Sequence, residues 1–130
     1  DDGKTTFIVV GESINLVGSC IKNSGATEGT INLILADATS IEAYAFEDCS
    51  ALKSVNLPKA TTIGYGAFWT CRNLTSLTFG SVITVVGENS FKDVPNGDCD
   101  LTLAAGQLNT GLAPSGNSWA GYTWKSITIK

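Results

Sequence analysis

The apolar positions of the chain recur every 22 residues in its middle part and at intervals of 24 and 26 residues toward the C-terminus. Residues 41–57 read IEAYAFEDCSALKSVNL and residues 63–79 read IGYGAFWTCRNLTSLTF, and the apolar positions of the two segments coincide. A further copy of the first half, VGENSFKDV at 86–94, follows one residue late. A unit this short cannot bury its own apolar side, so the repetition predicts a solenoid in which successive units stack on one another.

The second half of each unit predicts a short strand. The segment at 52–57, LKSVNL, alternates apolar and polar side chains and therefore sends Val55 and Leu57 to one face of a sheet. Related segments, the last of them degenerate, lie at 30–35, 74–79, 98–103, 124–129 and 7–9. Stacking these strands predicts a parallel sheet whose inner face carries two columns of apolar residues. The columns are Leu33, Val55, Leu77, Leu101 and Ile127, and Leu35, Leu57, Phe79, Leu103 and Ile129.

The first half of each unit predicts the wall opposite the sheet. Phe46 and Cys49 are three residues apart, a spacing that places both on one side of a single helical turn. Phe68 and Phe91 are expected to stack with Phe46 from that side. Strands and helical turns together predict an α/β fold, a right-handed β-α superhelix with short parallel strands and irregular terminal caps.

We expect one domain over residues 1–130, because this length fits a single domain or one repeat array. The repeats span 30–103. An array ends in exposed apolar edges, which atypical segments cover. Residues 1–29 are expected to form an N-terminal cap, and residues 104–130 a C-terminal cap. The C-terminal cap would cross irregularly over 104–123 to a closing strand at 124–129.

Composition and charge exclude several classes of function. Eight Lys and Arg against twelve Asp and Glu give a net charge of −4, which disfavours a nucleic-acid partner. The chain has no histidine, so Ser-His-Asp and Cys-His catalysis and His-ligated metals are excluded. No apolar run approaches the roughly 20 residues of a membrane-spanning helix. We therefore expect no cofactor and no transmembrane segment.

The four cysteines have two interpretations. Two disulfides are possible in an exported protein, and no pair has the close spacing of a zinc or redox motif. In the third copy, however, Val94 occupies the position of Cys49 and Cys71. That exchange marks a packing position, so Cys49 and Cys71 are expected to be free thiols in the core. The sequence leaves open whether Cys20 and Cys99 are free or disulfide-bonded.

Residues 63–74, IGYGAFWTCRNL, resemble the unit of the BspA-like, or Treponema pallidum-type, leucine-rich repeat without a gap. The match is strong over 41–94, and its strand half extends to 30 and to 103. The resemblance implies a leucine-rich repeat solenoid in a secreted or outer-surface protein of host-associated bacteria, often lipid-anchored, that acts in adhesion or protein recognition. It implies no catalytic residue. The acidic start, Asp1-Asp2, is compatible with a tether behind a lipid anchor.

Three groups of residues are candidates for binding a partner. The outer face of the sheet would present small hydroxyl and amide groups, which a solvated face also explains: Asn32, Ser54, Asn56, Ser76, Thr78 and Thr102. Tyr65 and Trp69 would form a contact patch on the turn side. Trp119 and Tyr122 would form an aromatic platform for carbohydrate or a partner, although packing within the cap explains them better.

Acidic residues offer weaker candidates. Asp93, Asp98 and Asp100 lie near Asn96 and supply oxygens of the kind that Ca²⁺ binds, but turn capping explains the segment better. Asp98 and Asp100 would share a strand face as a glycosidase pair requires, yet no cleft is indicated. We therefore expect no enzyme.

These observations lead to a non-enzymatic recognition or adhesion module, at the bacterial surface or secreted, that binds a host or partner protein on a rigid scaffold. A structural spacer or self-associating surface module is the alternative. A lectin-like binder using Trp119, Tyr122 or Trp69 is a third hypothesis.

Overall fold

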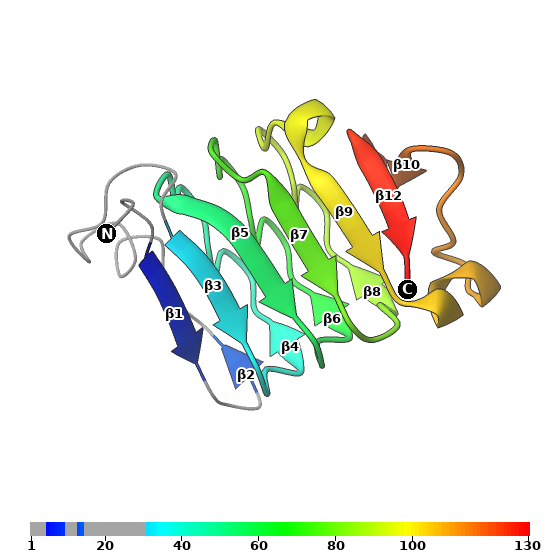
Figure 1. Cartoon of the computed structure of the whole chain (residues 1–130), viewed down its shortest axis with the longest axis horizontal. Coiled ribbons are helices and arrows are strands. Elements are labelled where there is room, and N and C mark those ends of the chain that lie inside the picture. Colours follow the sequence, from blue (N-terminus) through cyan, green and yellow to red (C-terminus); the bar gives the residue numbers. More distant parts are fainter. Residues whose placement is uncertain (1–4, 10–12, 15–30) are drawn as a thin grey trace.

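The computed structural model describes residues 5–9, 13–14 and 31–130. Its largest element is a six-stranded parallel sheet, drawn from blue to red in Figure 1. The strands, in their order across the sheet, are β1 (Thr5–Val9), β3 (Ile31–Leu35), β5 (Leu52–Leu57), β7 (Ser76–Phe79), β9 (Asp100–Leu103) and β12 (Ser126–Ile129). Strand order follows chain order, which is the topology of a solenoid.

A smaller parallel sheet lies behind the large one (Figure 1). Its strands, each of two residues, are β2 (Ser13–Ile14), β4 (Ser40–Ile41), β6 (Thr62–Ile63) and β8 (Val85–Val86). A short 3-10 helix, η1 (Asn96–Asp98), precedes β9. A second one, η2 (Ala105–Asn109), and a hairpin of β10 (Ser118–Trp119) and β11 (Tyr122–Thr123) lie between β9 and β12. None of the helices found among the described residues is long and apolar enough to cross a membrane.

The strand register confirms the predicted columns. Val55 pairs with both Leu33 and Leu77, and Leu101 pairs with both Leu77 and Ile127. The sixth strand predicted at residues 7–9 is also confirmed, since β1 pairs with β3 residue for residue. Residues 22 to 26 positions apart in the sequence are therefore neighbours in the sheet.

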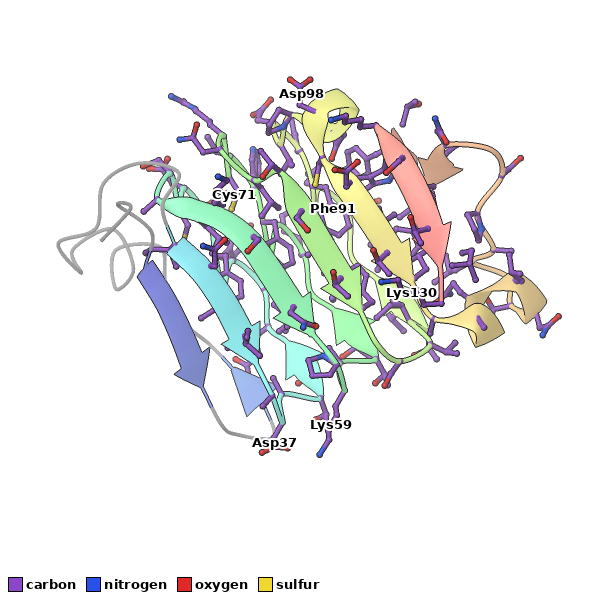
Figure 2. The ribbon with its side chains drawn as sticks, in the orientation of Figure 1. Asp37, Lys59, Cys71, Phe91, Asp98 and Lys130 are labelled. Atoms are coloured by element: carbon purple, nitrogen blue, oxygen red, sulfur yellow. The ribbon has the colours of Figure 1, made fainter. Side chains whose placement is uncertain are left out.

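The phenylalanine column is confirmed as well. Phe46, Phe68 and Phe91 are fully buried, and their rings stack with centroids 5.3 and 5.6 Å apart and planes inclined by 14° and 8°. Figure 2 shows the side chains that fill the space between the two sheets, with Phe91 and Cys71 labelled. This ladder of like residues is the core of the array.

The predicted wall of helical turns is not confirmed, because the segments after β4 and β6 form hydrogen-bonded turns and not helix. Alternate N–H groups in these turns have different acceptors. Those of Ala45 and Glu47 bond to the carbonyls three residues earlier, whereas those of Tyr44, Phe46 and Asp48 bond to carbonyls of the next turn, at Tyr65, Ala67 and Trp69. A helix would direct every N–H back along its own segment. In this repeat, every second N–H group of the turn bonds to the next unit instead.

Left-handed backbone positions recur in these turns. Tyr44, Gly66 and Asn89 have φ of 59°, 60° and 58° at equivalent places, and Asp48, Thr70 and Asp93 form a second such series. Most of these positions are occupied by non-glycine residues, at a conformational cost that the stacked neighbours offset. A close approach explains Gly87, because a Cβ there would lie 2.5 Å from the backbone nitrogen of Tyr65.

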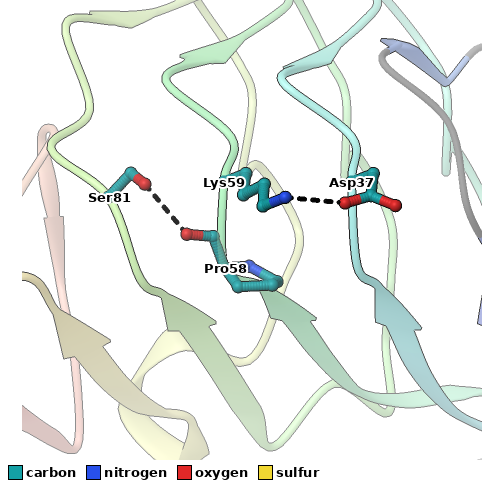
Figure 3. A network of polar contacts seen from close by, with 4 residues as sticks. All are labelled: Asp37, Pro58, Lys59 and Ser81. Carbon is teal, nitrogen blue, oxygen red and sulfur yellow. Dashed lines mark hydrogen bonds and ion pairs between the residues drawn. The ribbon is translucent and has the colours of Figure 1, made fainter.

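The loops that follow the large-sheet strands also stack (Figure 3). The Lys59 ammonium bonds to an Asp37 carboxylate oxygen at 2.8 Å, and the Ser81 hydroxyl donates to the Pro58 carbonyl oxygen at 2.8 Å. The hydrogen bond with Asp37, and then its charge, raise the pKa of Lys59 above its ordinary value. Both side chains are exposed, so this ion pair contributes little to stability.

The C-terminal segment is more ordered than the predicted irregular crossover. It contains η2 and the β10–β11 hairpin, and the closing strand β12 begins at Ser126. Trp124 begins the segment that repeats 52–57, so it takes the place of Leu52, and it is buried as Leu52 is. Gln107 is also fully buried, and its side-chain amide accepts a bond from the Ile83 N–H at 2.7 Å and donates to the Ile83 carbonyl at 2.9 Å. One side chain thus satisfies both backbone groups of a residue where the repeats end.

Of the predicted N-terminal cap, residues 1–4, 10–12 and 15–30 lie outside the described residues, and Asp1, Asp2 and Cys20 are among them. The described pieces, β1 and β2, pair with β3 and β4 and continue both sheets. The boundary of this cap stays a prediction.

Candidate functional site

Three aromatic rings gather on the turn side of the repeats. Tyr44 comes from the turn after β4, and Tyr65 and Trp69 come from the turn after β6. The ring centroids of Tyr44 and Tyr65 are 5.4 Å apart, those of Tyr65 and Trp69 are 6.3 Å apart, and those of Tyr44 and Trp69 are 6.5 Å apart. Tyr44 and Tyr65 are 43% and 38% exposed. We call these three residues the aromatic patch.

The glycine at position 66 makes the patch possible. A Cβ at Gly66 would lie 3.0 Å from Cε1 of Tyr44 and 3.2 Å from Cε3 of Trp69. The Tyr44 ring therefore lies against the bare backbone of the next turn. Gly66 also adopts the left-handed φ of its position without the strain of a side chain.

The following turn holds the patch with polar contacts. The Asn89 amide donates to the Tyr65 hydroxyl at 2.8 Å, and the Trp69 indole N–H donates to an Asp93 carboxylate oxygen at 3.3 Å. The Lys92 ammonium lies 5.2 Å from the centre of the Trp69 ring. The patch is therefore held by three successive turns, which makes it preorganised.

The outer face of the large sheet carries the predicted polar rows. Asn32, Ser54, Ser76, Asp100 and Ser126 lie in one register row, and Ile34, Asn56, Thr78, Thr102 and Thr128 lie in the next. The Ser54 hydroxyl donates to the Asn32 side-chain oxygen at 2.6 Å, and the Ser126 hydroxyl donates to Asp100 at 2.6 Å. These short side chains bond along the row and include none of the Trp, Tyr or Arg that dominate interface energies.

Of the two interpretations of Trp119, the structure supports packing within the cap and not an exposed platform. This residue is 2% exposed, its indole N–H donates to the Leu112 carbonyl at 2.7 Å, and its ring lies 5.7 Å from that of Phe79. Trp119 packs in the core because the array ends there with apolar rings to cover. Tyr122 is half-buried and lines a hollow of about 410 Å³ between residues 86–89 and the hairpin.

The acidic candidates do not converge on a common point. Asp98 belongs to η1 and not to a strand, so the predicted shared strand face with Asp100 is wrong. Asp93 is bonded to Trp69 and Asp100 accepts the Ser126 hydroxyl. Over 31–130 and the two short N-terminal segments, no group of three His, Cys, Asp or Glu residues could hold a metal ion.

The described cysteines are buried thiols outside any disulfide, as predicted for Cys49 and Cys71. The Cys71 thiol bonds to the Phe46 carbonyl at 3.0 Å, and its hydrogen bond with Cys49, together with burial, raises the pKa of Cys71 well above its ordinary value. Burial and then the charge of Asp100 raise the pKa of Cys99 to about 12. Such thiols stay protonated and unreactive near neutral pH.

Comparison with known proteins identifies the repeat. The family model of the BspA type leucine-rich repeat region matches residues 14–98 with six copies. The chain belongs to this family. BspA-type repeats suggest a scaffold for protein interaction, and the family is generally associated with bacterial surface proteins. The searches of curated proteins and of solved structures found no match.

Two important residues of this BspA-type chain were not among the sequence candidates. Tyr44 precedes Ala45-Phe46 as Gly66 precedes Ala67-Phe68, so an aromatic residue aligned with a glycine of the next unit was the available signal. Gln107 lies in a polar segment without repeats, where no pattern distinguishes it from its neighbours.

Proposed function

We propose that this chain is a non-enzymatic recognition module that binds a partner protein through the aromatic patch of a rigid repeat scaffold. The observation that carries the proposal is the convergence of Tyr44, Tyr65 and Trp69, from two adjacent turns, on one side of the molecule. Trp and Tyr are the residues that most often dominate interface energies. Their fixed position lowers the entropy cost of binding.

The scaffold supports this role because the patch needs little rearrangement. The phenylalanine column below it is fully buried, and Asn89, Lys92 and Asp93 contact its rings from the next turn. The repeat family supports a location at the bacterial surface or in secretion. We propose that location together with a host or neighbouring surface protein as partner.

A binding panel tests the function. Wild-type protein is measured by biolayer interferometry against purified extracellular proteins, beside the double variant Tyr44→Ala/Tyr65→Ala. We expect at least one panel member to bind in the micromolar range, and the double variant to bind at least tenfold more weakly, since two aromatic anchors are lost.

The matched control is Asn56→Ala/Thr78→Ala on the outer face of the large sheet, which should bind as the wild type does. Loss of binding in this control, with the patch variant unaffected, would move the binding surface to the sheet. If no panel member binds and sedimentation shows reversible association of the chain with itself, the recognition role is wrong and self-association takes its place.

A further inference from the structure

We propose that the aromatic patch receives an arginine-bearing segment of the partner protein, an inference that rests on the proposed function and names the chemistry of its ligand. The patch offers ring surface to solvent. Within the described residues the large apolar side chains that are exposed are Tyr44, Tyr65, Val85 and Leu108, and the two tyrosines are the pair in contact.

Three carboxylate side chains belong to the turns that carry these rings or lie next to them. Glu42 and Glu47 lie in the same turn as Tyr44, and Glu88 occupies the place in the third turn that Tyr65 occupies in the second. All three are exposed, and no Lys or Arg of the described segments forms an ion pair with them. These three carboxylates outnumber the one ammonium at the patch, that of Lys92, and the resulting negative charge favours a cationic ligand and disfavours an acidic one.

The chain itself shows that the patch accommodates a cation. The Lys92 ammonium lies 5.2 Å from the Trp69 ring centre, within the range of a cation–π interaction. Trp69 also stacks on Tyr44, with planes inclined by 23°. Lys92 and Tyr44 thus both contact the Trp69 ring. The solvent-exposed surfaces of the Tyr44 and Tyr65 rings are left to receive a cation from the partner.

Arginine fits this arrangement better than lysine. The guanidinium is planar and weakly hydrated, so it can stack on an aromatic face. The N–H groups at its edge then remain able to donate to a neighbouring carboxylate. The Tyr44 and Tyr65 rings meet edge to face, with planes inclined by 66°. One guanidinium could lie on the Tyr44 face and donate to a rim carboxylate at the same time.

Peptide titration tests the inference. The probes are three capped octapeptides in which glycine alternates with arginine, lysine or glutamate. Binding is followed by tryptophan fluorescence, because Trp119 and Trp124 are buried and Trp69 is in the patch, and by calorimetry. We expect the arginine peptide to bind with Kd on the order of 100 µM, the lysine peptide several-fold more weakly, and the glutamate peptide not at all.

Two double variants separate a π contact from simple apolar contact. Tyr44→Leu/Tyr65→Leu keeps apolar bulk and loses the ring faces, so the arginine peptide should bind about tenfold more weakly. Tyr44→Phe/Tyr65→Phe keeps the rings and should bind within about twofold of the wild type. Circular dichroism melting confirms that both variants are folded.

The inference is overturned if the glutamate peptide binds as well as the arginine peptide, or if the leucine variant binds as the wild type does. These failures differ from failure of the proposed function. A panel partner that requires Tyr44 and Tyr65 but is not displaced by the arginine peptide would leave the recognition role intact and refute the cationic ligand.

Discussion

The repeat array and the C-terminal segment bury their apolar surface in different ways. In the array the same contact occurs in every layer, as in the Phe46, Phe68 and Phe91 stack with its 5.3 and 5.6 Å spacings. In the C-terminal segment each contact occurs once. Gln107 bonds to Ile83, Trp119 covers Phe79, and the Trp124 indole N–H donates to the Trp119 carbonyl at 3.1 Å.

This difference teaches how an array ends. Each internal layer gains from the layer before it and the layer after it. The last layer has no successor, and among the described residues no backbone carbonyl accepts the N–H groups that follow the pattern at Asn89 and Phe91. Aromatic rings from the closing segment lie where a further layer would begin, with Trp124 5.1 Å from Phe91.

The largest expected effect is in the middle of the array. Phe68→Ala removes a ring that is stacked on both sides, and it should lower the free energy of unfolding by about 3–5 kcal/mol. Urea denaturation followed by circular dichroism measures the change. Phe68→Leu, which keeps most of the volume, should cost less than about 1.5 kcal/mol. Equal losses in the two variants would show that ring stacking does not hold the array together.

The next effect tests the single contacts of the closing segment. Gln107→Leu keeps the bulk but removes both bonds to Ile83, so about 2–3 kcal/mol of unfolding free energy should be lost. Hydrogen exchange at the Ile83 amide should accelerate more than exchange at Leu77, within the array. Asn109→Ala, at an exposed site of the same 3-10 helix, should change stability by less than about 0.5 kcal/mol. An unchanged Ile83 exchange rate would refute the capping role.

A smaller effect is expected beneath the aromatic patch. Gly66→Ala places a Cβ against Tyr44 and Trp69 at a residue with φ of 60°, and it should cost about 1–2 kcal/mol. The fluorescence of Trp69 should change with it. Gly111→Ala is the control, since nothing lies within 4 Å of its added Cβ. If both variants melt at the same temperature, the patch does not depend on the glycine.

The array was predictable and the closing segment was not, for a physical reason. A contact that recurs in each layer requires a similar residue at the same place in each repeat. Val55 and Leu77 could therefore be paired from their 22-residue spacing alone. A contact that occurs once produces no recurring pattern in the sequence. Packing of Trp119 within the cap could therefore be expected, but its partners Leu112 and Phe79 could not be named, and no pattern marked Gln107.

The turns show a second limit. The spacing of Phe46 and Cys49 is compatible with a helical turn and with the isolated hydrogen-bonded turns observed, because both place residues three positions apart on one side. What decides between them is the acceptor of each N–H, and for Phe46 that is Ala67, in the next unit. The patch was half predicted: Tyr65 and Trp69 were candidates, and Tyr44 joins them across the turn boundary.

In-register stacking has a genetic consequence. A tandem duplication of one 22-residue unit would insert a layer whose donors meet the same carbonyls and whose phenylalanine meets the same rings. The molecule would lengthen by about 4.8 Å per duplication, the spacing of neighbouring strands. The closing segment would keep its contacts with the last layer. Selection could thus vary the reach of such a protein without designing a new fold.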